Sequence, residues 1–306
     1  MTPLNKIAQK GKLSLGIVFP LEAYVGSVPR MENQIELAQL AEELGFKSLW
    51  FRDVPLHDPT FGDAGQMYDP FVYMTHIMNH TKDIALATGS IILPLRHPIH
   101  ILKAINSLQI LSGGRIIIGV ASGDRPVEFP AFGKALSSKN ELFRDSFNYL
   151  KALSADFPTY KSEDFGFADG KADLLPKSTI KTPYLITGHS GQTMNWIAKN
   201  GDGWLYYPRN TYFLSHMMND WHQSLENTNQ PWKPFMQSLY IDLIPGNNVK
   251  PTPIHLGIRT SPDYLRQHLL TIKEIGVNHV IFNLKFNTQQ IRETMTLISK
   301  EILPHI

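Results

Sequence analysis

Short apolar runs recur along the whole chain, and a segment with helical periodicity follows each of them. Every run is apolar on both faces and is bounded by glycine, proline or polar residues. Such runs are typical of parallel strands that are covered on both sides. They predict eight strands, over residues 13–19, 47–51, 84–90, 115–120, 183–187, 204–207, 235–244 and 277–283.

The segments between the runs carry apolar residues three and four positions apart, which is the spacing of one helix face. Asp69 and Pro70 suit an N-cap and the first helical position, and Gly45 suits a C-cap. Residues 52–68 and 154–181 are rich in polar residues, glycine and proline, and they predict loops. Helices are predicted over residues 30–44, 70–80, 98–111, 139–153, 190–200, 211–227, 261–275 and 288–303.

This alternation predicts the fold class. Eight strands and eight helices in a chain of 306 residues are expected of an α/β protein with a closed (β/α)8 TIM barrel and loop excursions. An open doubly wound sheet is the alternative that the same pattern allows. No linker divides the sequence and no tandem repeat goes beyond the strand–helix rhythm, so residues 1–306 are predicted to form a single domain.

The composition narrows the range of functions. A formal net charge of +2 gives no reason to expect a nucleic-acid surface. The absence of cysteine excludes disulfides, thiolate metal sites and a cysteine nucleophile. His97 and His100 share a helical spacing but no carboxylate joins them, so a cap or surface role is predicted for them rather than a metal site. The apolar runs are too short for a secretion signal or for a membrane span of roughly 20 residues. We therefore expect a cytoplasmic protein with no membrane partner.

Candidate site residues follow five of the predicted strands. In (β/α)8 enzymes the active site lies at the carboxyl ends of the strands. At these positions the chain has side chains that suit acid–base chemistry, and small residues that leave backbone groups open to a ligand. They are Arg52 and Asp53, Gly89 and Ser90, Ser122 and Arg125, the segment from Gly188 to Thr193, and Tyr207.

Two of these segments suit a phosphorylated ligand. Residues 188–193 combine small residues with the start of a predicted helix, which leaves N–H groups free in a region of positive potential. Arg125 offers a bidentate cation for phosphate or carboxylate. Structural roles are the alternatives: Ser190 as a helix cap, Asp124 as a surface partner of Arg125, and Asp53 as a loop carboxylate that caps or pairs with Arg52.

Taken together, these segments resemble the bacterial luciferase-like family of flavin-dependent monooxygenases over nearly the whole chain. ATGSIILPLRHPIHILKAINSLQILSGGRIIIGVASGDRPVEFPAFG, residues 87–133, is similar to the family's third strand, third helix and fourth strand. TGHSGQTMNWIAKNGDGW, residues 187–204, is similar to its phosphate loop with the following helix and strand. The resemblance implies a barrel, usually dimeric, that binds reduced FMN or the deazaflavin F420. We expect a homodimer with FMN, and F420 is the alternative cofactor.

The resemblance also implies roles for single residues. Gly89 and Ser90 fall where members of the family have a non-prolyl cis peptide against the flavin ring, and Tyr207 falls beside the cofactor. Asp53 and His189 are the candidates for acid–base chemistry on the substrate. The residues implied to hold the phosphate and ribityl chain of the flavin are Ser122, Arg125, Ser190, Gly191, Gln192 and Thr193.

Two departures from the family pattern bear on function. Val54 stands where the luciferase proper has an assisting histidine, and Ala121 stands where it has a reactive cysteine, so light emission is not expected. We expect an FMN-dependent monooxygenase or oxidoreductase that receives reduced FMN from a separate flavin reductase and uses O₂ on a small organic substrate. The alternatives are an F420-dependent hydride-transfer enzyme, a non-catalytic flavin-binding protein, and a phosphate-binding barrel isomerase.

Overall fold

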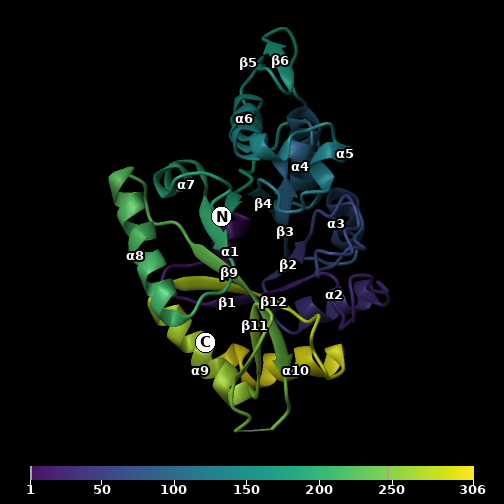
Figure 1. Cartoon of the computed structure of the whole chain (residues 1–306), viewed down its shortest axis with the longest axis vertical. Helices are drawn as coiled ribbons and strands as arrows, with labels where there is room; N and C mark the ends of the chain where they lie inside the picture. Colours follow the sequence, from purple (N-terminus) through teal and green to yellow (C-terminus); the bar gives the residue numbers. More distant parts are fainter. Residues whose placement is uncertain (1, 247) are drawn as a thin grey trace.

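A closed barrel of parallel strands forms the centre of the computed structural model, which describes residues 2–246 and 248–306 (Figure 1). Each barrel strand pairs in parallel with both of its neighbours, and pairing of β8 with β9 closes the ring. This confirms the predicted (β/α)8 barrel, and the alternative of an open doubly wound sheet is wrong. In ring order the strands are β1 (Ser14–Val18), β2 (Ser48–Phe51), β3 (Ala85–Ile92), β4 (Ile116–Ala121), β7 (Tyr184–Thr187), β8 (Gly203–Tyr206), β9 (Phe235–Leu243) and β12 (Val277–Asn283).

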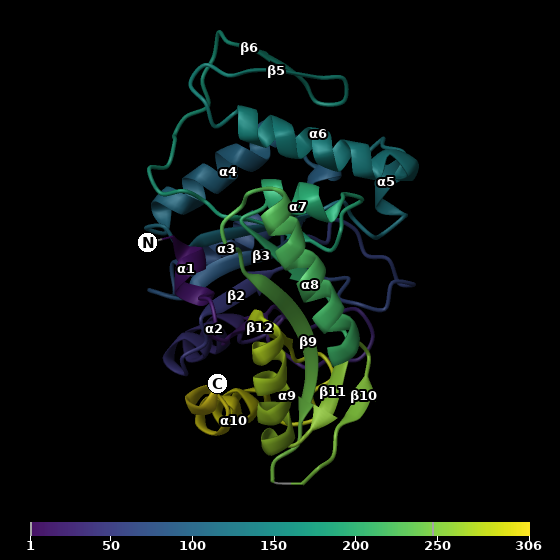
Figure 2. The same cartoon turned by 90° about the vertical axis from the view of Figure 1, so that its left-hand side faces the viewer.

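Helices connect the strands and cover the outside of the barrel (Figures 1 and 2). Their apolar faces and the outer faces of the strands form one continuous core. Asp69 accepts hydrogen bonds from the N–H groups of Phe71 and Val72 at 3.0 and 3.2 Å, which confirms it as an N-cap. The helices are α2 (Gln34–Glu43), α3 (Pro70–Met78), α4 (Pro98–Leu111), α6 (Lys139–Ala152), α7 (Met194–Asn200), α8 (Thr211–Asn227), α9 (Pro262–Ile275) and α10 (Ile291–Glu301).

A short N-terminal helix that the sequence pattern did not predict, α1 (Pro3–Ile7), closes the amino end of the barrel. Leu4 and Ile7 are buried in one cluster with Ala85 and Ile117, which point into the barrel interior. The interior is therefore a packed core at this end, and open space remains only toward the carboxyl ends of the strands. No helix in the described ranges is both long and apolar enough to span a bilayer.

Two hairpins lie outside the predicted strands and helices, the first of them in the loop predicted over residues 154–181. The excursion after α6 contains β5 (Thr159–Ser162) paired antiparallel with β6 (Gly166–Asp169), and it projects from the barrel at the top of Figures 1 and 2. A second hairpin, β10 (Thr252–Ile254) with β11 (Gly257–Thr260), extends the sheet because β11 pairs with the far end of β9. Both hairpins are too short and too exposed for the apolar signal that marks the barrel strands.

The close approach of β11 to β9 requires a glycine. A Cβ atom on Gly257 would lie 1.8 Å from the backbone oxygen of Tyr240, a distance that any side chain would have to relieve by moving the strand. Tyr240 and the hairpin are thereby held against the carboxyl end of the barrel. The remaining short elements are α5 (Glu128–Ala131) and three 3₁₀ turns, η1 (Leu93–Leu95), η2 (Leu136–Ser138) and η3 (Leu303–His305).

Candidate active site

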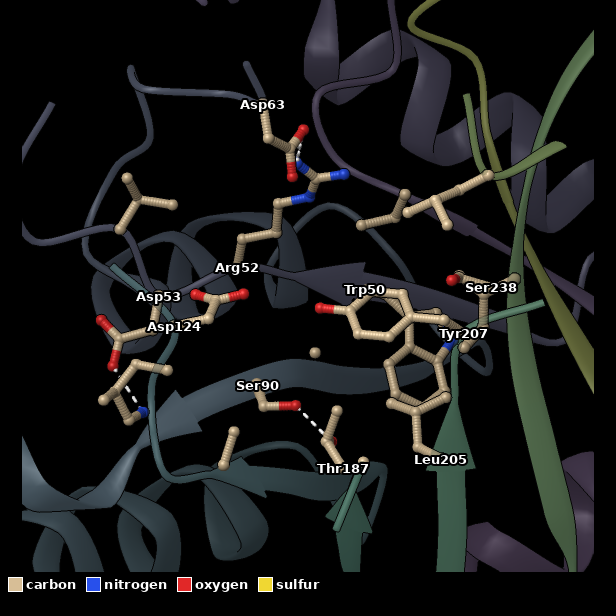
Figure 3. Close-up of a pocket in the computed structure, with 18 of the residues that line it drawn as sticks. Trp50, Arg52, Asp53, Asp63, Ser90, Asp124, Thr187, Leu205, Tyr207 and Ser238 are labelled. Carbon is tan, nitrogen blue, oxygen red and sulfur yellow. Dashed lines mark hydrogen bonds and ion pairs between the residues drawn. The ribbon is translucent and has the colours of Figure 1, made fainter. Parts of the chain in front are cut away.

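A cavity of about 450 Å³ lies at the carboxyl ends of the barrel strands (Figure 3). Its deep end meets the barrel interior at the apolar side chains of Val18, Trp50, Leu205 and Ile281. Its walls come from the segments that follow the strands. Of the candidate site residues predicted from the sequence, those that line the cavity are Arg52, Asp53, Gly89, Ser90, Ser122, Arg125, Gly188, Ser190 and Tyr207.

The Gly89–Ser90 peptide bond is cis, as predicted, and it lies at the cavity wall. The Ser90 hydroxyl contacts the Thr187 hydroxyl at 2.5 Å, which ties the end of β3 to the end of β7 (Figure 3). The indole of Trp50 packs against Gly89, where a Cβ atom would stand 3.2 Å from Cε3. Trp50 therefore forms the wall of the cavity beside Gly89.

A chain of hydrogen bonds fixes Trp50 from below. The indole N–H donates to Ser48 Oγ at 2.7 Å, and Ser48 Oγ lies 2.7 Å from His279 Nε2. His279 Nδ1 lies 2.6 Å from Ser14 Oγ, and the Ser14 hydroxyl donates to the carbonyl of Ile7. Because an indole can only donate and a carbonyl can only accept, the chain is complete when neutral His279 carries its proton on Nδ1.

Protonation of His279 would break this chain, and burial opposes the charge as well. Burial lowers the pKa of His279 from 6.5 to about 3. The unfolded chain therefore binds a proton below about pH 6.5 that the folded chain does not, and stability falls as the pH falls.

We predict that His279 alone removes about 2 kcal/mol of the free energy of unfolding between about pH 7 and about pH 5, at about 1.4 kcal/mol per pH unit below its unfolded pKa. Urea titrations of His279→Gln should show a shallower loss over this range. Exposed His216 provides the control, since His216→Gln should keep the wild-type pH dependence. An unchanged slope in His279→Gln would contradict this account of the residue.

Asp53 is fully engaged by Arg96 rather than free for catalysis. Arg96 donates from Nε to Oδ2 at 2.9 Å and from Nη2 to Oδ1 at 2.7 Å, and the Ile92 N–H donates to Oδ2 at 3.0 Å. The Asp53 side chain is 1% exposed. Arg96 also pairs with Asp69 at 2.8 Å. Burial opposes the charge of Arg96, but the bonds to Asp53 and Asp69 outweigh it and raise the pKa of the guanidinium. This geometry favours the structural alternative for Asp53, but the predicted partner was wrong: Arg96 pairs with Asp53, and Arg52 pairs with Asp63 instead.

The loop that was predicted as the start of a helix is a tight turn instead. Gly188, Ser190 and Gly191 have φ angles of 58°, 47° and 69°, and a helix cannot run through such left-handed residues. Helix α7 begins at Met194, and Thr193 is its N-cap, accepting from the Trp196 N–H at 3.2 Å. The sequence pattern placed the helix start too early because it read the whole turn as the first helical residues.

Ser190 and Gln192 fix this turn to the rest of the site. Ser190 Oγ donates to the Thr187 carbonyl at 2.9 Å and accepts from the Ser122 N–H at 3.2 Å, which joins the ends of β7 and β4. Gln192 is buried and accepts from Arg144 Nε at 2.7 Å. Gly191 and Thr193 are exposed and, with Gln192, stand outside the cavity lining, at the back of the turn.

His189 lies outside the cavity. It is exposed, and its ring stands at 5.7 Å from the rings of both Trp204 and Tyr206. The prediction of an acid–base role for His189 therefore finds no support in its position, because it does not face the space where a ligand would lie. Its neighbour Gly188 accepts from the Trp204 indole N–H at 2.7 Å, so the segment packs on an aromatic cluster.

Arg125 is a buried cation on the cavity wall. It is 6% exposed, its guanidinium stacks 4.3 Å from the Phe61 ring centre, and its one hydrogen bond in the described chain is a long 3.4 Å contact to the Ala64 carbonyl. Asp124 is exposed and forms no ion pair with it among the described residues, so the predicted alternative of a surface pair is wrong. A buried guanidinium without an acidic partner is suited to bind an anionic ligand.

A second polar cluster surrounds Arg52, which the sequence had indicated, but its partners Asp63 and Tyr240 were missed. Arg52 Nη1 donates to Asp63 Oδ1 at 2.6 Å, and the Tyr240 hydroxyl donates to the same oxygen at 3.1 Å (Figure 3). Burial raises the pKa of Asp63, but Arg52 outweighs this and lowers it to about 2. Burial raises the pKa of Tyr207 to about 12, so its hydroxyl keeps its proton at neutral pH. Asp63 lies 11 residues from Arg52 within the predicted loop, and Tyr240 lies on the distant strand β9, so neither formed a local motif with Arg52.

The described residues contain no group of three or more histidine and acidic side chains that could hold a metal ion. His97 is instead the N-cap of α4, accepting from the Ile99 N–H at 3.3 Å. The other ring nitrogen lies 2.8 Å from the Phe165 carbonyl. The predicted capping role of this residue is confirmed.

Comparison with known proteins finds relatives of this chain at low sequence identity. The alkanal monooxygenase alpha chain of Photorhabdus laumondii is 25% identical over 172 residues, which are 56% of this chain and 46% of that protein. This chain thus spans about half the length of that relative. An uncharacterised protein of Mycobacterium tuberculosis is 27% identical over 268 residues, 81% of this chain and 85% of its own.

Solved structures share the fold at low sequence identity. An F420-dependent secondary alcohol dehydrogenase, in complex with an F420-acetone adduct, superposes with a TM-score of 0.79 at 17% identity, over 95% of this chain and 98% of its own. The oxygenating constituent of 3,6-diketocamphane monooxygenase from Pseudomonas putida, in complex with FMN, gives 0.76 at 14% identity, over 96% and 99%. The family model for luciferase-like monooxygenases matches residues 13–244, so the chain belongs to the luciferase-like monooxygenase family.

Proposed function

We propose that this protein is a flavin-dependent oxidoreductase that binds reduced FMN in the cavity and uses O₂ to oxygenate a small organic substrate. The observation that carries the proposal is the pairing of an apolar cavity base, built on Trp50 and Gly89, with a buried arginine on the wall, Arg125. A flavin has the matching two ends, a flat ring system and a phosphate.

The donor chemistry of the cavity fits such a group. Trp50, Ile92 and Leu205 offer apolar surface to a ring, and the hydroxyls of Ser90, Ser122 and Ser190 offer hydrogen bonds to a polar chain. The guanidinium of Arg125 forms no ion pair with an acidic residue in the described chain. Its N–H groups are therefore available to a phosphate. We propose Ser122, Arg125 and Ser190 as the phosphate and ribityl contacts, with Gly89, Ser90 and Tyr207 beside the ring. The predicted contacts at Gly191, Gln192 and Thr193 find no support in their position, because these residues stand outside the cavity lining.

Arg144 is an addition to this set. It lies on α6, outside the segments that follow the strands, and its Nε donates to the Gln192 amide oxygen at 2.7 Å. Its guanidinium carbon lies 5.9 Å from the Trp196 ring centre. The group thus brings positive charge to the outer side of the turn that the sequence had indicated as a phosphate seat.

When bound, reduced FMN would supply the electrons that activate O₂. The protein's own part is to hold the ring, to exclude water and to place the substrate. The apolar base excludes water at Trp50 and Leu205. Arg96 holds Asp53, which in turn holds the Ile92 N–H and so the end of β3. Tyr207 can donate a hydrogen bond at neutral pH, because its hydroxyl keeps its proton there.

The proposal includes partners that the family resemblance implied. Reduced FMN would come from a separate flavin reductase, the protein would act in the cytoplasm, and two copies would form a homodimer. A co-purification with the reductase and a light-scattering mass would test the first and last of these.

A second cofactor is favoured by one observation. The F420-dependent dehydrogenase covers 95% of this chain with a TM-score of 0.79, so the same barrel can serve a deazaflavin in another protein. A deazaflavin would support hydride transfer rather than the use of O₂. This is the alternative function, and one experiment separates the two.

The protein should be titrated without oxygen against reduced FMN and against reduced F420. We expect reduced FMN to bind more tightly, and we expect oxygen uptake above the free-flavin rate when a panel of small organic substrates is added in air. Tighter binding of F420, with hydride transfer to ketones and no excess oxygen uptake, would establish the alternative. Tight flavin binding with no turnover of either kind would favour a non-catalytic flavin-binding protein.

A further inference from the structure

Arg52 is buried in the cavity wall but only partly used by the protein. It is 9% exposed and lies on the side of the cavity opposite Ser90 and Thr187 (Figure 3). Among the residues that the structure describes, its hydrogen bond runs from Nη1 to Asp63 at 2.6 Å. Nε and Nη2 of the same guanidinium donate no hydrogen bond that the described chain shows, and the Tyr240 hydroxyl is a neutral neighbour of this guanidinium. A desolvated guanidinium is costly unless its N–H groups are paired.

Arg96 provides an example in the same protein of a guanidinium that binds a carboxylate through its Nε and Nη2 edge. Its Nε and Nη2 donate to the two oxygens of Asp53 at 2.9 and 2.7 Å, a bidentate arrangement. Two parallel N–H groups match the spacing of carboxylate oxygens better than that of a single carbonyl. The unused edge of Arg52 therefore has the shape of a carboxylate receptor.

The charges around Arg52 leave room for an added anion. Asp63 already accepts from both Arg52 and the Tyr240 hydroxyl. A second buried cation, Lys285, is 5% exposed and donates to the carbonyl of Gly62, next to Asp63, at 2.6 Å. Lys285 forms no ion pair among the described residues, so this wall holds two buried cations and one carboxylate, Asp63, which is paired with Arg52. Of the acidic residues on the lining, Asp124 forms no ion pair among the described residues, and it is exposed to water.

The side chains around Arg52 indicate what the rest of the ligand should be like. Tyr240, which contacts Asp63, lines the cavity together with His255, whose ring lies 5.7 Å from that of Tyr240, and with Leu256. Their surfaces are aromatic or apolar. A ligand whose anionic group meets Arg52 would lay an apolar or aromatic body against these side chains. It would then extend toward the Gly89–Ser90 side, where the flavin is proposed.

We propose that the substrate is a small monocarboxylate with an apolar or aromatic body, whose carboxylate binds the Nε–Nη2 edge of Arg52. The assignment of this ligand as the substrate rests on the proposed function. Binding of a carboxylate to Arg52 does not depend on it. The flavin phosphate is assigned to Arg125 and the turn at Ser190, so the two anions have different receptors.

The test compares matched carboxylates and amides in the wild-type protein by calorimetry, with reduced FMN absent and then present. Benzoate and hexanoate are the probes, and benzamide and hexanamide are their neutral controls. We expect each carboxylate to bind at least about tenfold more tightly than its amide, because a charged pair adds to the hydrogen bonds. A wild-type protein that binds neither acid more tightly than its amide overturns the proposal.

Variants locate the binding to one side chain. Arg52→Gln should lose the preference for carboxylate, and Arg52→Lys should lose most of it while keeping the charge beside Asp63. Arg292→Lys, an exposed arginine on α10, should keep the wild-type preference. Preserved carboxylate binding in folded Arg52→Lys also overturns the proposal. The affinity for reduced FMN, measured in the same samples, tests the proposed function. A failure of the proposed function is therefore distinguishable from a failure of the carboxylate site.

Discussion

Arg96→Gln should lower the free energy of unfolding by about 3 kcal/mol, because it leaves a buried carboxylate without its cation. Asp53 is 1% exposed at its side chain and receives two of its three hydrogen bonds from Arg96. Water cannot replace these donors at so buried a position. The loss should appear in urea titrations at neutral pH.

The double variant Asp53→Asn with Arg96→Gln tests the cause. Removing both charges removes the unpaired ion, so the double variant should be more stable than Arg96→Gln alone. Arg292→Gln, which breaks an exposed pair with Glu36 at 3.6 Å, should change stability by less than about 0.5 kcal/mol. If Arg96→Gln is as stable as Arg292→Gln, the carboxylate of Asp53 is not held as the structure indicates, and its acid–base role is open again.

Arg125→Gln should lower the affinity for reduced FMN about 100-fold, while changing stability by no more than about 1 kcal/mol. Both effects have one cause. Arg125 is buried with a long contact to the Ala64 carbonyl and a stacking contact on Phe61, so the folded protein gains little from its charge. A phosphate would gain a great deal from it.

Riboflavin separates this effect from a general loss of binding. It lacks the phosphate, so its affinity should differ far less between wild type and Arg125→Gln than that of FMN does. Fluorescence titrations under anaerobic conditions give both values. Equal losses for FMN and riboflavin would mean that Arg125 supports the shape of the cavity rather than the phosphate, and an unchanged FMN affinity would remove it from the site.

The order of elements along the chain could be predicted because each barrel strand is apolar on both faces and each helix on one. α4 at residues 98–111 and β12 at 277–283 have the predicted bounds. The hairpin β5–β6 was missed because its strands are mostly exposed, and the start of α7 was placed too early because three left-handed residues precede it. Periodicity records which side chains are buried and does not record the sign of φ.

The candidate site was predictable only where the fold topology decides it. The strand ends gave Asp53, Ser90, Ser122, Arg125 and Ser190, and all five line the cavity. Which of them are free was not predictable, since partners come from distant segments.

Arg96 lies 43 residues from Asp53, and Tyr240 lies 177 from Asp63. His189 stood next to cavity residues in the sequence yet faces aromatic rings outside it. Partners of this kind follow from three-dimensional packing, which one sequence does not contain.

The central claim is that a reduced flavin binds in the cavity at the carboxyl ends of the strands. Ala121 lines this cavity at the end of β4, whereas Ala131 is exposed on α5. The most direct measurement is an anaerobic titration of reduced FMN into wild type, Ala121→Trp and Ala131→Trp, with circular dichroism to confirm folding. The account predicts one FMN per chain in wild type and Ala131→Trp, and loss of binding in folded Ala121→Trp. Wild-type affinity in Ala121→Trp, or no binding in the wild-type protein, would contradict it.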